Sequence, residues 1–199
     1  MARVLVTGFG PFPGAPENPS AAIARRLSRM PLPRHDLATF VFPTAYRAVD
    51  RHLPALTAAF RPHVIVMFGL AANTPHVRIE TRARNAISRK PDVQGEVPAQ
   101  DVIRVAGAMG RHGEAPFARL AQASRATGVK TRLSADAGTY VCNYAYWRAI
   151  ELLRRRSGLH RAVFVHVPDP GRRDAPSLEQ LVRAARAIVA AAAWDLPAR

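Results

Sequence analysis

The chain has 199 residues, of which 48% are apolar and 22% charged, a composition that excludes a disordered, collagen-like or coiled-coil protein. Lys and Arg number 29 against 14 Asp and Glu, so the formal net charge is +15. The arginines are dispersed, and their longest run is 154–156. We therefore interpret the surplus as surface composition, and a nucleic-acid partner is not expected.

Cys142 is the single cysteine, which excludes an intrachain disulfide and a zinc site built on several thiolates. No apolar run approaches the ~20 residues needed to cross a bilayer. The apolar stretch after Met1 is too short for a signal sequence. We expect a cytoplasmic protein without membrane contact.

The first half of the chain alternates short apolar runs with helical patterns. The runs predict strands at 3–7, 37–42 and 64–68. Asn18 and Pro19 supply a cap and a first-turn proline for a helix over 21–30, and Thr44 is the predicted cap of a helix that continues to Phe60. The segment 71–113 has no clean period and is rich in glycine and proline, which is typical of a functional or mobile region.

The second half continues the alternation. A helix is predicted over 117–127, a weaker strand over 130–134, and a helix from Cys142 to a terminating Gly158. A strand follows at 162–166, and Ser177 with Gln180 forms a capping box for a last helix over 178–194. The pattern predicts one α/β domain over 1–199, an α/β/α sandwich with a mostly parallel sheet.

Ligands of open parallel sheets collect at the carboxyl ends of the strands. Of the seven histidines, only His166 ends a predicted strand at this edge. Cys142 falls in the first turn of a predicted helix, where the dipole and free N–H groups stabilise a thiolate and receive an oxyanion. We therefore expect a thiolate–imidazolium pair of Cys142 and His166, although a buried inert cysteine and a structural histidine remain alternatives.

The group that orients His166 is left open between three carboxylates. Glu80 follows the third strand but is flanked by Arg78 and Arg82, so a plain salt bridge is its alternative role. Asp136 and Asp169 are rivals, and Asp169 is better suited to bind turn amides.

Two ligand classes are poorly supported by the sequence. His76 and Glu80 have no third metal ligand at a suitable spacing, so no metal is expected. The glycine loop after the first strand has Pro13 in place of the third glycine of the dinucleotide motif, so no nucleotide cofactor is expected.

Four segments together resemble the pyroglutamyl peptidase I family, cysteine peptidases that remove N-terminal 5-oxoproline. They are 7–12 with 18–20 (TGFGPF and NPS), Glu80 with Ala83 and Asn85, 136–143 (DAGTYVCN) and 164–168 (FVHVP). Their order and spacing cover nearly the whole chain.

The resemblance implies Cys142 as nucleophile, His166 as general base and then acid, and Glu80 as the group that orients His166. It further implies that the substrate pocket involves Phe9, Phe12, Asn18, Thr44 and Val141. The implied partners are peptides that begin with pyroglutamate and further copies of the chain, in a dimer or tetramer.

The chain departs from the family pattern in two places. Thr81 stands where an arginine usually follows the glutamate, although Arg82 comes next. Residues 69–74 read GLAANT where many bacterial members read roughly GQAGGR, so an expected arginine and an amide side chain are absent. A catalytically altered paralogue that binds modified peptide ends is therefore the alternative function, ahead of a basic nucleic-acid-binding protein.

Overall fold

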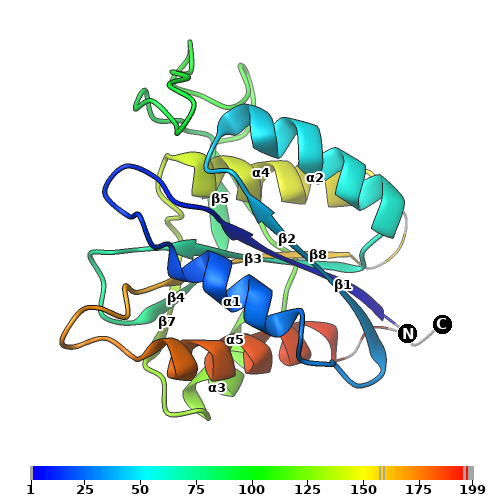
Figure 1. Cartoon of the computed structure of the whole chain (residues 1–199). Helices are drawn as coiled ribbons and strands as arrows, with labels where there is room; N and C mark the ends of the chain where they lie inside the picture. The colour runs from blue at the N-terminus through cyan, green and yellow to red at the C-terminus, as the bar shows by residue number, and fades with distance from the viewer. Residues whose placement is uncertain (1, 157, 159, 195, 197–199) are drawn as a thin grey trace.

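Six strands form the central sheet of the computed structural model, which describes residues 2–156, 158, 160–194 and 196. Strands β2, β1, β3 and β8 are parallel neighbours, whereas β4 pairs antiparallel with β8 and parallel with β7 (Figure 1). In sheet order the strands are β2 (His35–Phe42), β1 (Ala2–Phe9), β3 (Val64–Leu70), β8 (Arg161–Val167), β4 (Val77–Glu80) and β7 (Thr131–Ser134). The mostly parallel sheet predicted from the sequence is confirmed.

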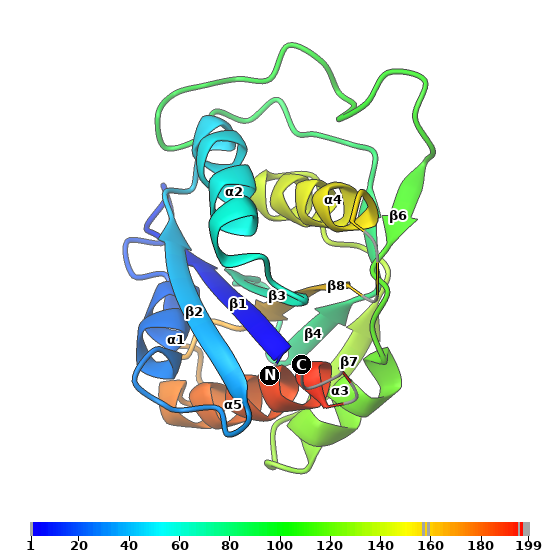
Figure 2. The ribbon, with the colours of Figure 1, turned by 90° about the vertical axis from the view of Figure 1, so that its right-hand side faces the viewer.

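In the part of the chain that the structure describes, five helices cover the two faces of this sheet, as Figure 2 shows for their arrangement. One layer holds α1 (Pro19–Leu27), α3 (Phe117–Arg125) and α5 (Leu178–Ala193). The other holds α2 (Tyr46–Phe60) and α4 (Val141–Arg154). The α/β/α architecture is thus as expected. None of the helices described is long and apolar enough to span a membrane.

The strands are buried on both faces, so alternate residues belong to two separate cores. In β1, Val4 and Val6 pack in the core beneath α1 and α5, while Leu5 packs in the core beneath α2 and α4. In β8, Val165 and Phe164 divide between the same two cores. This alternation fixes which side chains of each strand face α4.

The helix ends agree with the sequence in two cases and differ in two. Asn18 caps α1 through its side chain, and Ser177 with Gln180 makes the predicted capping box. Thr44 is not a cap, because Ala45 is the N-cap of α2 and the Thr44 hydroxyl donates to Gly10 O instead. Helix α4 ends at Arg154, before Gly158.

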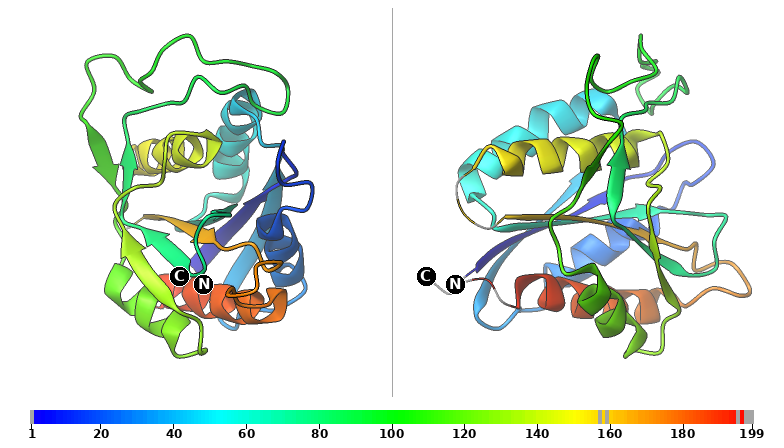
Figure 3. Two further views of the ribbon diagram at one scale, coloured as in Figure 1. Left: turned by 90° about the vertical axis from the view of Figure 1, so that its left-hand side faces the viewer. Right: turned by 180° about the vertical axis from the view of Figure 1, so that it is seen from behind.

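The segment 71–113 holds three short strands that the sequence did not reveal. The three strands are β4, β5 (Arg82–Arg84) and β6 (Gly110–His112). The last two form a separate antiparallel pair. The chain between them passes over the layer of α2 and α4 (Figures 2 and 3). Short strands between irregular stretches leave no period long enough to detect.

Helix α1 packs closely on β1 at Gly8. A Cβ at Gly8 would lie 2.3 Å from Ser20 O, a backbone atom that cannot move away cheaply. We expect Gly8→Ala to lower the free energy of unfolding by about 1–3 kcal/mol because the helix must shift. Gly10→Ala is the matched control, since its Cβ would lie 3.5 Å from Phe42 O. Urea unfolding of both variants measures the difference, and equal stabilities would contradict the prediction.

Candidate active site

A cavity of about 300 Å³ lies at the edge where β1, β3 and β8 end. It is lined by aromatic and aliphatic side chains, one arginine, the cysteine and a histidine. Its lining residues are Phe9, Phe12, Asn18, Thr44, Leu70, Ala71, Arg78, 136–140, Cys142 and His166. Three segments distant in sequence therefore bring Cys142, His166 and the residues around Phe9 to one cavity, at the edge predicted for a ligand.

His166 is bound by Glu80 across the junction of β8 and β4. The antiparallel register pairs Glu80 with Phe164, so His166 is its diagonal neighbour on the same face. His166 Nδ1 lies 2.8 Å from Glu80 Oε1. Both residues are buried, and Glu80 is 0% exposed. Of the three carboxylates considered from sequence, Glu80 is the one that contacts His166.

The other two carboxylates bind backbone N–H groups of the turns in which they lie. Asp169 Oδ1 accepts a hydrogen bond from Gly171 N, as expected of a turn aspartate. Asp136 Oδ1 accepts from Gly138 N and pairs with Arg84. Neither of them has a hydrogen bond to His166 among the residues described.

The Glu80 carboxylate is also held by Arg78, so the alternative role given to it is present as well. Arg78 Nε and Nη2 donate to Oε1 at 3.0 and 2.8 Å. Burial by itself raises the pKa of Glu80. The hydrogen bond with His166 and the charge of His166, then a hydrogen bond with Ser134 and the charge of Arg78, outweigh burial and lower the pKa below its ordinary value. Glu80 is therefore ionised near neutral pH.

Cys142 is the second residue of α4, as its sequence context predicted. The N-cap Tyr140 makes no side-chain capping bond, so the first-turn N–H groups are left for a ligand. Gly69 makes room for the thiol, because a Cβ there would lie 2.8 Å from Cys142 Sγ. Burial, with a smaller effect of the Glu80 charge, raises the pKa of the thiol to about 12.

The two phenylalanines differ in burial. Phe9 is 1% exposed and its ring stacks on Phe42 at 5.7 Å, so it forms a fixed wall of the cavity as well as part of the core. Phe12 is half-buried and its ring centroid lies 6.4 Å from that of Tyr140. Tyr140 thus extends the aromatic wall from the opposite side.

Asn18 and Thr44 line the cavity and share one acceptor. Asn18 Nδ2 and Thr44 Oγ1 both donate to Gly10 O, at 3.0 and 2.9 Å. They fix the loop after β1. Val141 is fully buried in the core and its side chain is not part of the cavity lining.

Several residues of the site were not singled out from sequence. Tyr146 donates its hydroxyl to Glu80 O, and the buried Asn143 binds the backbone of Arg84 on both its N–H and its C=O. These bonds connect α4 to β4, which carries Glu80, and to β5, which carries Arg84. Asn143 stood in the cysteine motif, whereas nothing in the pattern marked Tyr146 as a partner of β4.

An α/β/α fold with a cysteine at a helix N-terminus and a carboxylate-bound histidine in one cavity defines a hydrolase of the cysteine type. The profile of the pyroglutamyl peptidase family matches residues 2–193. The pyrrolidone-carboxylate peptidase 1 of Ralstonia nicotianae is 33% identical over 84% of this chain and 79% of its own. The pyrrolidone-carboxylate peptidase of Bacillus subtilis is 30% identical over 97% and 94%.

Solved structures agree with these sequence relatives. The pyroglutamyl peptidase I of Bacillus amyloliquefaciens has a TM-score of 0.87 at 27% identity and covers 97% of both chains. The pyrrolidone carboxyl peptidase of Thermococcus litoralis has a TM-score of 0.89 at 25% identity, over 96% of this chain and 93% of its own. The chain belongs to the pyroglutamyl peptidase family, as its motifs indicated.

The raised pKa of Cys142 makes a prediction about thiol reactivity. A His166→Ala variant lacks the histidine base, so its alkylation by iodoacetamide should increase about tenfold per pH unit from pH 7 to 10 without a plateau. The chain in urea, where the ordinary pKa of 9.0 applies, should level off above that pH. Cys142 is the only thiol, so total incorporation measures it directly. A plateau below pH 9 in the folded variant would refute the assignment.

Proposed function

We propose that this protein removes N-terminal 5-oxoproline from peptides, with Cys142 as nucleophile, His166 as general base and acid, and Glu80 as the orienting carboxylate. The hydrogen bond between His166 Nδ1 and Glu80 Oε1 carries the proposal. It fixes the tautomer, because Nδ1–H donates to the carboxylate and Nε2 is left to accept a proton.

We infer that the Cys142 thiol keeps its proton in the resting site. Burial raises the pKa of Cys142, so the thiolate–imidazolium pair expected from sequence is not favoured before substrate binds. The proton moves from Sγ to His166 Nε2 as the thiol attacks, and the ionised Glu80 stabilises the imidazolium that forms. The buried carboxylate thus offsets much of the cost of ionising the thiol.

The cycle then follows from the groups present. Sγ bonds to the carbonyl carbon that links 5-oxoproline to the next residue, and first-turn N–H groups of α4, including that of Val141, receive the oxyanion. The C–N bond breaks as the imidazolium gives its proton to the leaving amine. Water, deprotonated by His166, attacks the thioester, the C–S bond breaks and the thiol regains its proton. Free 5-oxoproline and the shortened peptide leave.

The cavity suits a neutral lactam ring. Phe9, Phe12 and Tyr140 supply aromatic walls, and a ring without charge needs such walls and a few amide partners rather than a carboxylate. Asn18 and Thr44 have donors engaged with Gly10 O, so we assign them to holding the loop that carries Phe9 and Phe12. Peptides with N-terminal pyroglutamate are accordingly the proposed substrates.

The altered loop at 70–74 keeps a regular turn. Ala71 N donates to Val167 O, and Thr74 N donates to Ala71 O. Leu70 and Ala71 line the cavity, so the departures in this loop change its apolar wall, and the hydrogen bond between Glu80 and His166 is present beside them. A paralogue that binds without turnover is the competing outcome of the test below.

The proposal places the enzyme in the cytoplasm as a dimer or tetramer. An association surface is supported by apolar side chains exposed on the loop between β5 and β6, where Val105 is 71% and Met109 88% exposed. We expect light scattering to give at least a dimer, and Met109→Asp to shift the mass toward the monomer. A monomer at every concentration would rule out the oligomer.

The activity has a direct test. Purified protein should release the arylamine from a 5-oxoprolyl arylamide, and Cys142→Ser should lower kcat/KM by at least about 100-fold because a serine hydroxyl is not ionised by a histidine as a thiol is. Full activity in the Cys142→Ser protein would exclude the mechanism. Binding of 5-oxoprolyl peptide without turnover by the unmodified protein would favour the altered paralogue.

A further inference from the structure

Arg78 lies in the active-site cavity in addition to the three residues assigned above. It is two residues before Glu80 on β4, so the two side chains lie on the same face of the strand. The register pairs Arg78 directly with His166 on β8. The Arg78 side chain is 24% exposed and lines the cavity with Cys142 and His166.

The guanidinium joins two parts of the site. Nε and Nη2 bind the same Glu80 oxygen that accepts from His166 Nδ1. Nη2 also donates to Asp136 O, at the start of the loop that leads through 137–140 into Cys142. The Arg78 side chain therefore contacts both the carboxylate that binds His166 and the loop that precedes Cys142 in the chain.

We propose that Arg78 is a positioning residue for the reaction, which keeps Glu80 ionised through the whole cycle and fixes the loop that precedes Cys142. The inference rests on the proposed function.

The need for a permanent charge follows from the cycle. His166 is cationic only between thiol attack and departure of the amine, and again during hydrolysis of the thioester. In the intervals Glu80 would be a carboxylate at 0% exposure beside a neutral imidazole, which is a costly arrangement. A guanidinium stays protonated throughout, and its planar fork reaches Glu80 and Asp136 O together, which a lysine ammonium does much less well.

The pH profile distinguishes positioning from a general structural role. Arg78 lowers the pKa of Glu80, so Arg78→Met should raise that pKa and make the carboxylate protonate at higher pH. We expect the acid limb of kcat/KM to move up by at most about one pH unit, so the activity lost relative to wild type is up to about threefold greater at pH 5 than at pH 8. Arg78→Lys should restore most of the acid limb but not all of kcat.

Arg132 provides the matched control, because it pairs with Arg78 in the β4–β7 register and is exposed. Arg132→Met should keep the wild-type profile. A uniform loss at every pH in Arg78→Met, with the acid limb unmoved, would overturn the inference.

A double variant distinguishes loss of the contact with Glu80 from a general loss of stability. Adding Arg78→Met to Glu80→Gln should lower kcat/KM by much less than it does in the wild-type background, because the carboxylate it acts on is gone. Additive losses would overturn the role assigned to Arg78. Failure of the proposed function looks different, since wild type would then not cleave the 5-oxoprolyl arylamide at any pH.

Discussion

The hydrogen bond between His166 and Glu80 is the constraint around which the site is organised. It exists because β4 joins the sheet antiparallel to β8, which sets Glu80 diagonally opposite His166 on the face that α4 covers. The antiparallel pair of this sheet, β8 with β4, thus lies where a buried carboxylate must contact the histidine.

The raised pKa of the Cys142 thiol and the lowered pKa of Glu80 belong to one electrostatic arrangement. The cavity that raises the pKa of Cys142 also strengthens every charge interaction inside it. A negative carboxylate disfavours a second negative charge on Sγ while His166 is neutral, and favours the pair once the proton has moved to His166. Attack and proton transfer are therefore coupled, and the free thiol is protected from reagents when no substrate is bound.

The sequence predicts the main features of this site and misses its connections. His166 and Cys142 follow from local rules, namely the carboxyl edge of a parallel strand and the first turn of a helix. Local rules name Glu80 but do not select it over Asp136 and Asp169, because selection depends on an antiparallel pairing that a four-residue strand does not encode in its period. The family resemblance alone singled out Glu80.

Rules based on neighbouring residues also fail where a side chain binds a partner that is distant in the chain. Thr44 has the chemistry of a helix cap, yet its hydroxyl donates to Gly10 O, 34 residues away in the chain. Arg78 and Arg82 are each two residues from Glu80 in sequence, so either could form the salt bridge with it. The alternation of β4 and the break before β5 send Arg78 to the carboxylate and Arg82 to Ala135 O. Neither outcome is a matter of propensity, since both depend on tertiary contacts.

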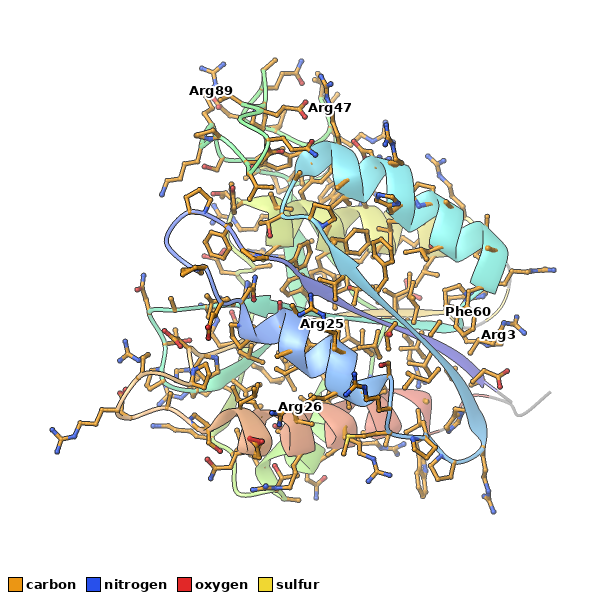
Figure 4. The ribbon with its side chains drawn as sticks, in the orientation of Figure 1. Arg3, Arg25, Arg26, Arg47, Phe60 and Arg89 are labelled. Carbon is orange, nitrogen blue, oxygen red and sulfur yellow. The ribbon has the colours of Figure 1, made fainter. Side chains whose placement is uncertain are left out.

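The arginine surplus has a structural use that composition alone did not indicate. All but two of the 29 basic residues are arginines, and those labelled in Figure 4 come from several elements rather than one patch. Many donate to backbone carbonyls where elements end: Arg3 to Arg61 O, Arg156 to Pro62 O and Arg125 to Thr131 O. A guanidinium has five fixed donors, so it satisfies such carbonyls better than an ammonium does. Arg78 makes the same kind of bond at the edge of the active site, where it donates to Asp136 O. This carbonyl belongs to the loop that precedes Cys142, the proposed nucleophile.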